Sequence, residues 1–422
     1  TGTPKPTWVE GKYGKALNFD GSQNYLLAAS SPSVTNVTIE GWVYPTATLT
    51  SAKGAVFEVQ ADYGLRFTGS KLAMALTTVN NTFNQLGLSN TTINPNHWYF
   101  VAATYDGTTV TYYLNGLQDG TKTTDSGNMS STSGRNFYIG RDTNSTFFPG
   151  IIDDVKVYNY ARTQAQIAYD YNRGAPVGWW KMDECQGTTL NDSSGNNNAG
   201  TINIGASGTQ TSAGTCNTSG TAWGNGVIGK FNSSLNFDGT DDYISITNPS
   251  SDDFGTGPMS ISAWIKTTDT TDFQSIVDNK FQGTNNAGFD LQLNTTPLGG
   301  KPFFRTANGT SQSSTNQSAP PNVADGQWHH LVGTLTRGIS SDTISLYVDG
   351  KLITSSSVTA GWNISSSQNL YIGAYSTALG NSNFGGQIDD VRIYNYALSL
   401  TQVQKLYNDG FSTFYGPSTG TP

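Results

Sequence analysis

Two pairs of adjacent aspartates stand at the start of nearly identical apolar segments, PGIIDDVKVYNY and GGQIDDVRIYNY. The first pair is Asp153 and Asp154, and the second is Asp389 and Asp390. A carboxylate beside an apolar core loses hydration, which costs free energy unless a partner compensates for the charge. The repeated segment therefore predicts a cation at each pair.

Strand alternation indicates which aspartate of each pair needs that cation. Residues two apart share a face of a strand, so Asp153 lies with Val155 and Asp154 lies with Lys156. The second copy alternates in the same way, and its core-facing carboxylate is Asp389. We therefore expect Asp153 and Asp389 to be metal ligands.

The expected ion is calcium, because this hard cation binds about six to eight oxygens from carboxylates, carbonyls and water. Further ligands are expected from two early NFDG bends, through Asp20 in the first half and Asp238 in the second. Asn24 and Asp242 are weaker candidates nearby. The alternative is that these side chains only cap turns by accepting backbone N–H groups. The prediction is one structural calcium in each half.

The sequence shows no motif that favours catalysis. A glycosidase needs two carboxyl groups that flank the scissile bond, and the aspartate pairs are more economically assigned to metal or turn roles. No nucleophile motif, phosphate-binding loop or histidine metal cluster is found. The glutamates show no pair at a suitable spacing, and they are Glu10, Glu40, Glu58 and Glu184. We therefore expect that the protein is not an enzyme.

Aromatic side chains favour a binding function, because sugars stack on aromatic faces. Most of the nine tryptophans occupy repeated strand positions and are expected in the core. Aromatics in unrepeated segments are candidate ligand contacts, because loops on a rigid scaffold usually carry recognition, although each could equally fill a gap. The candidates are Tyr63, Phe83, Phe147, Phe148, Phe273, Phe281, Phe304 and Tyr375.

Short antiparallel strands, used twice in the same order, would position these residues. KALNFDGSQNYLLA corresponds to SSLNFDGTDDYISI, VTIEGWVYP to MSISAWIKT, and NFYIGRD to NLYIGAY. Apolar and polar residues alternate in these segments with the period of two that half-buried strands require. The dipeptides Asn115-Gly116 and Asp349-Gly350 predict tight hairpin turns, because both turn positions need positive φ.

A short helix is expected at the end of each half. Thr163 with Gln166 and Ser399 with Gln402 have capping-box spacing. Glycine at 174 and at 410 stands where a left-handed C-terminal stop belongs. The apolar face of each helix is expected to pack on the strands.

The boundaries that follow are residues 1–174 for the first domain, 177–412 for the second and 413–422 for a tail. The second half contains GWWKMDECQGTTLNDSSGNNNAGTI before its NFDG bend, and the first half has no counterpart. The first domain is therefore expected to lack an N-terminal strand. Either the chain is cut from a longer array, or the strand comes from elsewhere. The tail FSTFYGPSTGTP is one candidate donor to a neighbouring copy, which would give a polymer by strand exchange.

Bulk composition limits the function classes. The chain has 422 residues, a formal charge of -8 and only 12% charged residues, and it contains no basic stripe, which argues against nucleic-acid binding. No apolar run is long enough to span a bilayer. The two cysteines, Cys185 and Cys216, flank a polar, glycine-rich loop that favours a disulfide over a free buried pair. A disulfide predicts an extracellular or cell-surface location.

Taken together, LNFDG, YIG, LYVDGK and IDDV-[KR]-[IV]-YN resemble tandem laminin-G-like domains of the concanavalin A-like lectin and glucanase superfamily, as found on microbial surface proteins. The resemblance covers nearly the whole chain. It implies an all-β protein of two tandem β-sandwich jelly rolls, commonly with bound calcium. In laminarinase-type relatives the first aspartate of the final strand holds that ion, which corresponds here to Asp153 and Asp389.

The expected function is non-catalytic extracellular recognition of a glycan or a cell-surface protein, strengthened by linking two domains. The alternative is a structural stalk or filament subunit that assembles by strand complementation. Glycoside hydrolysis is the least favoured hypothesis. A glycan array measured with calcium and with chelator would separate the first two functions.

Overall fold

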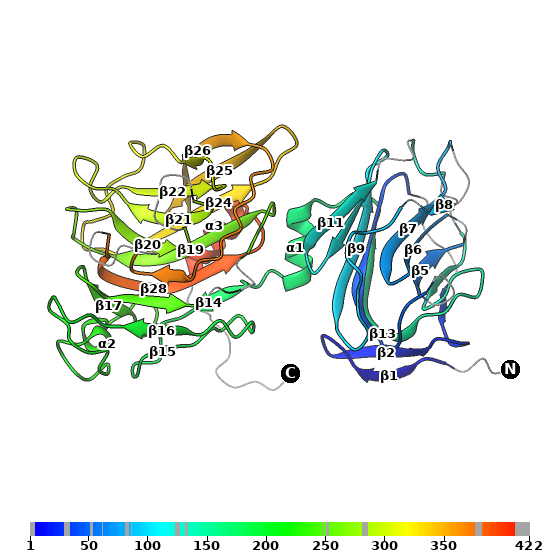
Figure 1. The fold of residues 1–422 in the computed structure, drawn as a ribbon, viewed down its shortest axis with the longest axis horizontal. Coiled ribbons are helices and arrows are strands. Elements are labelled where there is room, and N and C mark those ends of the chain that lie inside the picture. Colours follow the sequence, from blue (N-terminus) through cyan, green and yellow to red (C-terminus); the bar gives the residue numbers. More distant parts are fainter. Residues whose placement is uncertain are drawn as a thin grey trace. The chain divides into compact units, whose positions relative to one another are not determined.

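The computed structural model describes residues 5–28, 34–50, 54–60, 62–80, 84–85, 87–122, 127–130, 134–247, 249, 253–280, 286–375 and 382–409. The chain divides into two compact units, Thr1–Arg173 and Gly174–Pro422. Each unit is a sandwich of two antiparallel sheets (Figure 1). The predicted all-β class with two tandem sandwiches is confirmed.

In the first unit, two sheets form from strands that are distant in sequence. The first sheet has the order β1 (Thr7–Glu10), β2 (Lys15–Asp20), β13 (Pro149–Tyr158), β4 (Val37–Pro45), β9 (Tyr99–Tyr105), β10 (Val110–Leu114) and β11 (Leu117–Lys122). The second sheet has the order β3 (Leu26–Ala28), β12 (Phe137–Ile139), β5 (Ala55–Val59), β6 (Tyr63–Thr68), β7 (Lys71–Leu76) and β8 (Asn84–Gln85).

The second unit repeats this plan with additional strands. Its first sheet has the order β14 (Gly178–Trp180), β28 (Gly385–Tyr394), β19 (Met259–Lys266), β24 (His329–Thr336), β25 (Ser341–Val348) and β26 (Lys351–Thr359), and β17 (Leu235–Asp238) also pairs with β28. The second sheet has the order β15 (Thr189–Leu190), β16 (Gly200–Asn203), β18 (Tyr243–Ile246), β27 (Leu370–Ile372), β20 (Gln274–Asp278), β21 (Gly288–Leu293), β22 (Pro302–Ala307) and β23 (Gln312–Ser314).

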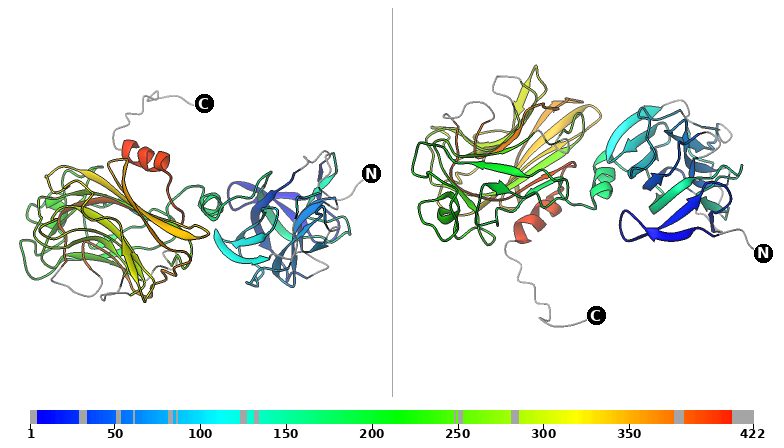
Figure 2. Two further views of the ribbon diagram at one scale, coloured as in Figure 1. Left: turned by 90° about the horizontal axis from the view of Figure 1, so that it is seen from above. Right: turned by 60° about the horizontal axis from the view of Figure 1, so that its bottom comes forward.

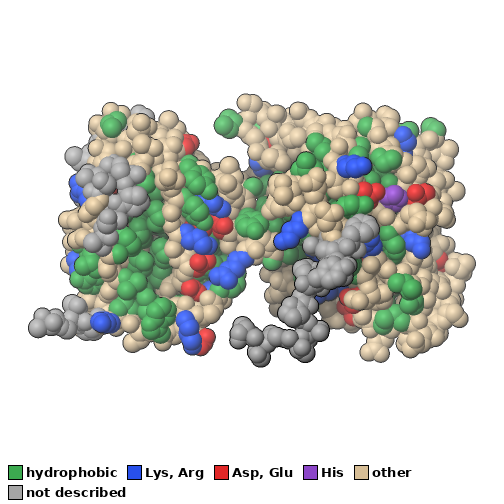
Figure 3. Space-filling view, turned by 180° about the vertical axis from the view of Figure 1, so that it is seen from behind, with side chains coloured by type: hydrophobic (Ala, Val, Ile, Leu, Met, Phe, Trp, Pro, Cys, Tyr) green, Lys and Arg blue, Asp and Glu red, His purple; other side chains and the backbone are tan. Residues whose placement is uncertain are grey.

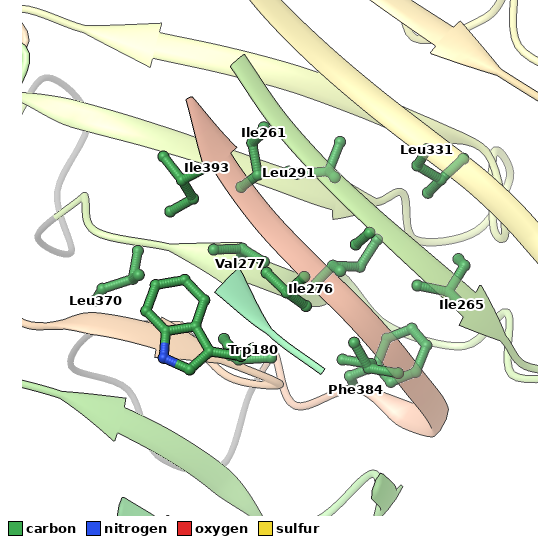
Figure 4. Packing of buried hydrophobic residues seen from close by; sticks show 14 of the residues in the cluster. Trp180, Ile261, Ile265, Ile276, Val277, Leu291, Leu331, Leu370, Phe384 and Ile393 are labelled. Atoms are coloured by element: carbon green, nitrogen blue, oxygen red, sulfur yellow. The ribbon is translucent and has the colours of Figure 1, made fainter. Parts of the chain in front are cut away.

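The cores are formed by apolar residues that recur at every second position of the strands. Val37, Ile39 and Val43 of β4 are fully buried, as are Ile261 and Ile265 of β19. Apolar side chains from both sheets of a unit meet between them, and Figure 4 shows part of this packing in the second unit. Burial of this apolar surface is the main force that holds each sandwich together.

The predicted hairpins and helix caps are confirmed. Asn115 and Gly116 have φ of 50° and 80°, and Asp349 and Gly350 have φ of 50° and 75°. Helix α1 (Gln164–Asn172) begins with the Thr163–Gln166 capping box. Helix α3 (Leu400–Asp409) begins with the reciprocal Ser399–Gln402 hydrogen bonds and lies outside its sandwich (Figure 2). A further short helix, α2 (Ala222–Asn225), was not predicted.

Each closing helix packs a tyrosine on a strand tryptophan. Tyr171 stacks on Trp42 with ring centroids 5.4 Å apart, and Tyr407 stacks on Trp264 at 5.7 Å. The C-terminal stop of α1 has positive φ at both Arg173 and Gly174, and residue 410 lies outside the described residues. Among the described residues, no helix combines the length and apolarity needed to cross a bilayer.

A disulfide joins Cys185 and Cys216, as predicted, with their Cα atoms 4.9 Å apart. The backbone N–H of Cys216 also donates to the carbonyl of Cys185 at 3.0 Å. The bridge spans 31 positions and closes the segment that carries β15 and β16.

Candidate functional site

The first NFDG bend is held by its own hydrogen bonds. Oδ1 of Asp20 accepts the backbone N–H groups of Ser22 at 2.9 Å, Gln23 at 3.0 Å and Asn24 at 3.2 Å. Oδ1 of Asn24 in turn accepts the N–H of Asp20 at 2.9 Å. These contacts are those of a capped turn, and the bend contributes a single carboxylate.

The second NFDG bend gathers three carboxylates. One oxygen from each of Asp238, Asp241 and Asp242 lies within 4.8 Å of the others. Burial raises the pKa of Asp242 to about 6, and the charges of Asp238 and Asp241 add to this rise. At the corresponding positions of the first bend only Asp20 is charged, since Gln23 and Asn24 occupy the other two.

A loop that precedes β17 donates backbone N–H groups to these carboxylates. Thr209 and Gln210 donate to Oδ2 of Asp238 at 2.7 and 3.1 Å, and Ser207 donates to Oδ2 of Asp241 at 2.9 Å. Oδ1 of Asp241 is buried and has no hydrogen-bond partner. The cluster therefore holds the loop and still has an acceptor oxygen to offer a cation.

The closing strands bury their first aspartates on the outer face of the first sheet, because Asp153 pairs with Trp42 and Asp389 with Trp264, the tryptophans covered by the closing helices. The prediction that these aspartates face the sandwich core is therefore wrong. Asp389 is fully buried, and burial raises its pKa to about 8. Its Oδ2 accepts the backbone N–H of Phe231 at 2.8 Å, and its Oδ1 is buried without a hydrogen-bond partner. Asp153 is 9% exposed and accepts the N–H of Tyr13 at 3.1 Å. Both aspartates tie the loop before the NFDG strand to the closing strand.

The ladder register separates these aspartates from the NFDG bends. Asp238 pairs with Gly385, which is four residues before Asp389. In the first unit Asp20 pairs with Pro149, four residues before Asp153. At about 3.3 Å per residue this offset is roughly 13 Å, so the register does not bring the predicted ligands of either unit together around one ion.

The second aspartate of each pair sits in a β-bulge. Asp154 and Asp390 have φ of 49° and 50°, and the ladder to the neighbouring strand shifts register there. Asp154 pairs with Lys156 at 2.9 Å, and Asp390 pairs with Arg392 at 2.7 Å. The predicted association of Asp154 with Lys156 is confirmed, but the strict alternation on which it rested is interrupted by the bulge.

A polar cluster on the second sheet of the second unit was not foreseen. Asp278 and Asp290 lie opposite each other on β20 and β21 and are fully buried, on the face turned away from the core. Nε of Arg305 contacts Oδ2 of Asp290 at 2.7 Å. Nζ of Lys280 lies 3.2 Å from the hydroxyl oxygen of Tyr375. We call these five residues the sheet-face cluster.

The first unit has a related cluster at the same register position. Glu58 pairs with Tyr138 as Asp278 pairs with Tyr371. Nη2 of Arg66 lies 2.9 Å from Oε2 of Glu58 and 3.0 Å from Oδ2 of Asp142. Both units therefore place a guanidinium among acidic groups on the outer face of the second sheet.

Half-buried aromatics adjoin this position in the first unit. The guanidinium carbon of Arg141 lies 4.4 Å from the ring centroid of Tyr25, 5.0 Å from that of Tyr138 and 5.6 Å from that of Phe147. We call these four residues the Arg141 patch. It combines flat apolar faces with a cation at the protein surface.

The structure places the predicted ligand aromatics in different environments, and only some of them lie at a surface cluster. Phe147 belongs to the Arg141 patch, and Tyr375 belongs to the sheet-face cluster. Phe148 is fully buried in the first core, so its prediction as a surface contact is wrong. Tyr63 lies on β6 rather than in a loop and is only 1% exposed, which removes it from the ligand contacts as well.

One of the remaining aromatic candidates was also predicted wrongly. Phe304 is a core residue of β22. Phe273 is exposed and meets the edge of Phe303 at 6.2 Å. The positions of Phe83 and Phe281 lie outside the described residues.

A family model described as the concanavalin A-like lectin/glucanases superfamily matches residues 20–168 and 238–404. The chain belongs to this superfamily. Its two matched regions carry the NFDG bends, the closing strands and both outer-face clusters. The resemblance to laminin-G-like domains is thereby confirmed. No curated protein matches the chain.

Solved structures resemble this superfamily member at low identity. Domains LG4-5 of the mouse laminin alpha1 chain are 14% identical, with 95% of this chain and 93% of that chain covered and a TM-score of 0.30. Domain 4 of AbnA, a GH43 extracellular arabinanase from Geobacillus stearothermophilus in complex with arabinotriose, is 21% identical, with 55% and 98% covered and a TM-score of 0.37.

The chain is also 17% identical to botulinum neurotoxin type C, a toxin whose cell entry is described as dependent upon interaction with two ganglioside molecules. The match covers 57% of this chain and 52% of the toxin chain, with a TM-score of 0.41. The present chain thus spans about half the length of the toxin it matches. The superfamily assignment depends on the family match and not on these structures.

Proposed function

We propose that the protein is a non-catalytic extracellular recognition protein that binds carbohydrate on the outer face of the second sheet. The observation that carries this proposal is the Arg141 patch next to the Glu58 and Arg66 cluster. Aromatic faces offer stacking surfaces to sugar rings, and charged groups nearby can match hydroxyls. The disulfide supports an oxidising, extracellular location.

Carbohydrate binding is tested with the whole chain on an array of neutral and sialylated glycans. Tyr25→Ala and Phe147→Ala remove stacking faces at half-buried positions, and we expect at least a tenfold loss of affinity for the glycan identified. Trp8→Ala removes an exposed aromatic outside the patch and serves as the matched control. Binding that survives both patch substitutions would contradict the proposal, as would release of reducing sugar from the bound glycan.

We also propose that calcium binds to the second unit, at Asp238, Asp241 and Asp242. Three converging carboxylates and the unpartnered Oδ1 of Asp241 suit a hard cation. A bound cation would offset the mutual repulsion of the three charges. The first unit fits poorly, because its bend has only one carboxylate, with Gln23 and Asn24 at the positions of Asp241 and Asp242.

Calorimetric titration with calcium chloride tests this proposal. We expect one ion per chain, lost in an Asp238→Asn/Asp241→Asn double variant and kept in Asp20→Asn. Removing the ion with EDTA should lower the melting temperature of the second unit, because a ligand of the folded state stabilises it. Two ions per chain, or no change with EDTA, would contradict the assignment.

A further inference from the structure

The second unit opens with a segment that the first unit lacks among its described residues. We call Gly178–Asn203 the strap. Its first strand, β14, pairs with β28 through Gly178–Trp180 opposite Val391–Ile393. Its last strand, β16, pairs with β18 through Gly200–Asn203. One continuous segment therefore closes an edge of each sheet.

Trp180 of the strap fills the space between the sheets. Its side chain is fully buried, and its Nε1 donates to the carbonyl of Asn198 at 2.9 Å. Figure 4 shows the indole ring beside Leu370 and Val277 of the second sheet. The strap thus contributes a core side chain as well as two strands.

In the first unit the two corresponding edges are free of a strap. The last residues of β13, Lys156–Tyr158, pair with β4, and no described residue pairs with their other side. Strand β3 pairs with β12, and its other side likewise has no partner strand among the described residues. Strand edges present unpaired N–H and C=O groups that can accept another strand.

Side chains along these two edges are exposed where their counterparts are buried. Val391 and Ile393 of β28 are fully buried, whereas Val157, the counterpart of Ile393, is 36% exposed. Ile244 of β18 is fully buried, whereas Leu26, its counterpart on β3, is 39% exposed. The apolar residues of the first unit are those of a covered edge, but no strand among the described residues covers it.

A hollow of about 460 Å³ lies between the free end of β13 and strands β5 and β12 of the second sheet. Its lining includes Phe57, Phe137, Ile139, Val155 and Val157. By ladder register, Phe57 and Phe137 correspond to Val277 and Leu370, the residues beside Trp180 in the second unit. Figure 3 shows apolar side chains in a band across this face of the first unit.

The charged pair at the bulge also lacks a contact that the strap provides. In the second unit, Nε1 of Trp179 donates to Oδ1 of Asp390 at 2.7 Å, and the guanidinium of Arg392 lies 4.7 Å from the Trp179 ring. The counterparts Asp154 and Lys156 form the same ion pair. Their side chains are 26% and 35% exposed, against 9% and 16% for Asp390 and Arg392.

We propose that the first unit is a strand acceptor for a polypeptide segment with the chemistry of the strap. The segment is an extended Gly-Trp-Trp-type strand that runs antiparallel to β13 at Val155–Val157. Its first indole lies over the Asp154–Lys156 pair, and its second enters the hollow. A returning strand pairs with β3. Strand addition of this kind takes affinity from main-chain hydrogen bonds and specificity from alternate side chains.

A small apolar ligand would fit the hollow by volume, but it would leave both strand edges unpaired. In the second unit, the strap fills the corresponding space and pairs with both corresponding edges. The proposal does not depend on carbohydrate binding, because the acceptor face and the Arg141 patch use different residues.

The test uses the whole chain and a fluorescent synthetic peptide with the sequence of residues 176–204 and serine in place of Cys185. Fluorescence anisotropy should show saturable binding of one peptide per chain. A peptide with Trp180→Ala should bind at least tenfold more weakly. Hydrogen exchange should show new protection of backbone amides in β13 and β3.

Two variants of the chain make the test specific. Val157→Asp places a charge at the acceptor edge at a partly exposed position and should reduce affinity at least tenfold. Val79→Asp, at an exposed valine of the same unit outside the hollow, should leave affinity unchanged. Absence of binding at millimolar peptide would overturn the proposal.

Two other outcomes would also overturn it. Binding unaffected by Val157→Asp would mean that the peptide exchanges with the strap of the second unit. Self-association of the chain that Val157→Asp abolishes would mean that a second copy covers the edge.

Discussion

His330 is a titratable side chain held away from water. It is 1% exposed, its ring lies 4.9 Å from that of Trp264, and its Nε2 lies 2.8 Å from Oγ of Ser262. Burial, together with the positive charges of Arg392 and Lys230, lowers its pKa from 6.5 to about 3. Phe100 occupies the same register position in the first unit, opposite Trp42.

The second unit is expected to lose stability in mild acid through His330. The unfolded state binds the proton at about pH 6.5 and the folded state does not, so stability is complete above that pH and falls toward pH 3. Between pH 6.5 and about pH 5 this amounts to about 2 kcal/mol. Urea unfolding of His330→Phe should show a weaker dependence on pH over this range. Equal losses in both proteins would contradict the assignment.

The aspartate pairs show what alternation can predict and what it cannot. Asp153 and Asp389 are buried, but they lie on the outer face of the sheet and not with Val155 and Val391 in the core, because the bulge at the next residue reverses the alternation. Asp154 and Asp390 adopt positive φ and form a bulge, which the pattern of apolar and polar residues in the sequence does not predict. The partner of Asp389 is a backbone N–H of a distant loop, and it depends on ladder register, which the sequence leaves open.

At the scale of elements, local signals predicted structure well. The dipeptide turns and the capping boxes depend on two to four adjacent residues, and each forms as expected. The prediction that Phe148 contacts ligand was wrong because its unrepeated segment was taken for a surface loop. The Phe148 side chain enters the core instead. The sheet-face cluster joins residues of three strands with Lys280 and Tyr375 from loops, so the charged strand residues each resemble an ordinary polar position on an outer face.

The disulfide also acts at the scale of elements, because it closes the segment that contains β15 and β16. A bridge that spans 31 positions restricts the unfolded chain and contributes about 3 to 4 kcal/mol in the chain-entropy description. The Cys185→Ser/Cys216→Ser double variant should therefore lower the unfolding free energy of the second unit by up to that amount. Urea unfolding of the variant measures it, with reductant added to the unchanged protein as the control.

At the scale of the whole chain, the apolar cores belong to separate units. One buried cluster draws its residues from the second unit, and two others draw theirs from the first. The repeated sequence therefore yields two sandwiches, each with its own interior.

Core truncations should act on one unit at a time. Phe148→Ala should lower the stability of the first unit by about 3 to 5 kcal/mol, and Leu291→Ala should lower that of the second by about 2 to 5 kcal/mol. Calorimetry should show one transition shifting in each variant while the other stays in place. A single variant that moves both transitions would indicate that the two units unfold together.

The pairing of β14 with β28 also determines how the second unit responds to tension. Gly178, where the chain enters this ladder, faces Ile393, and the chain leaves the strand at Tyr394. Entry and exit lie at the same end of an antiparallel pair, so a pull along the chain loads its hydrogen bonds one after another. Such a ladder opens like a zipper at low force, and optical tweezers should record β14 peeling away before the rest of the sandwich ruptures.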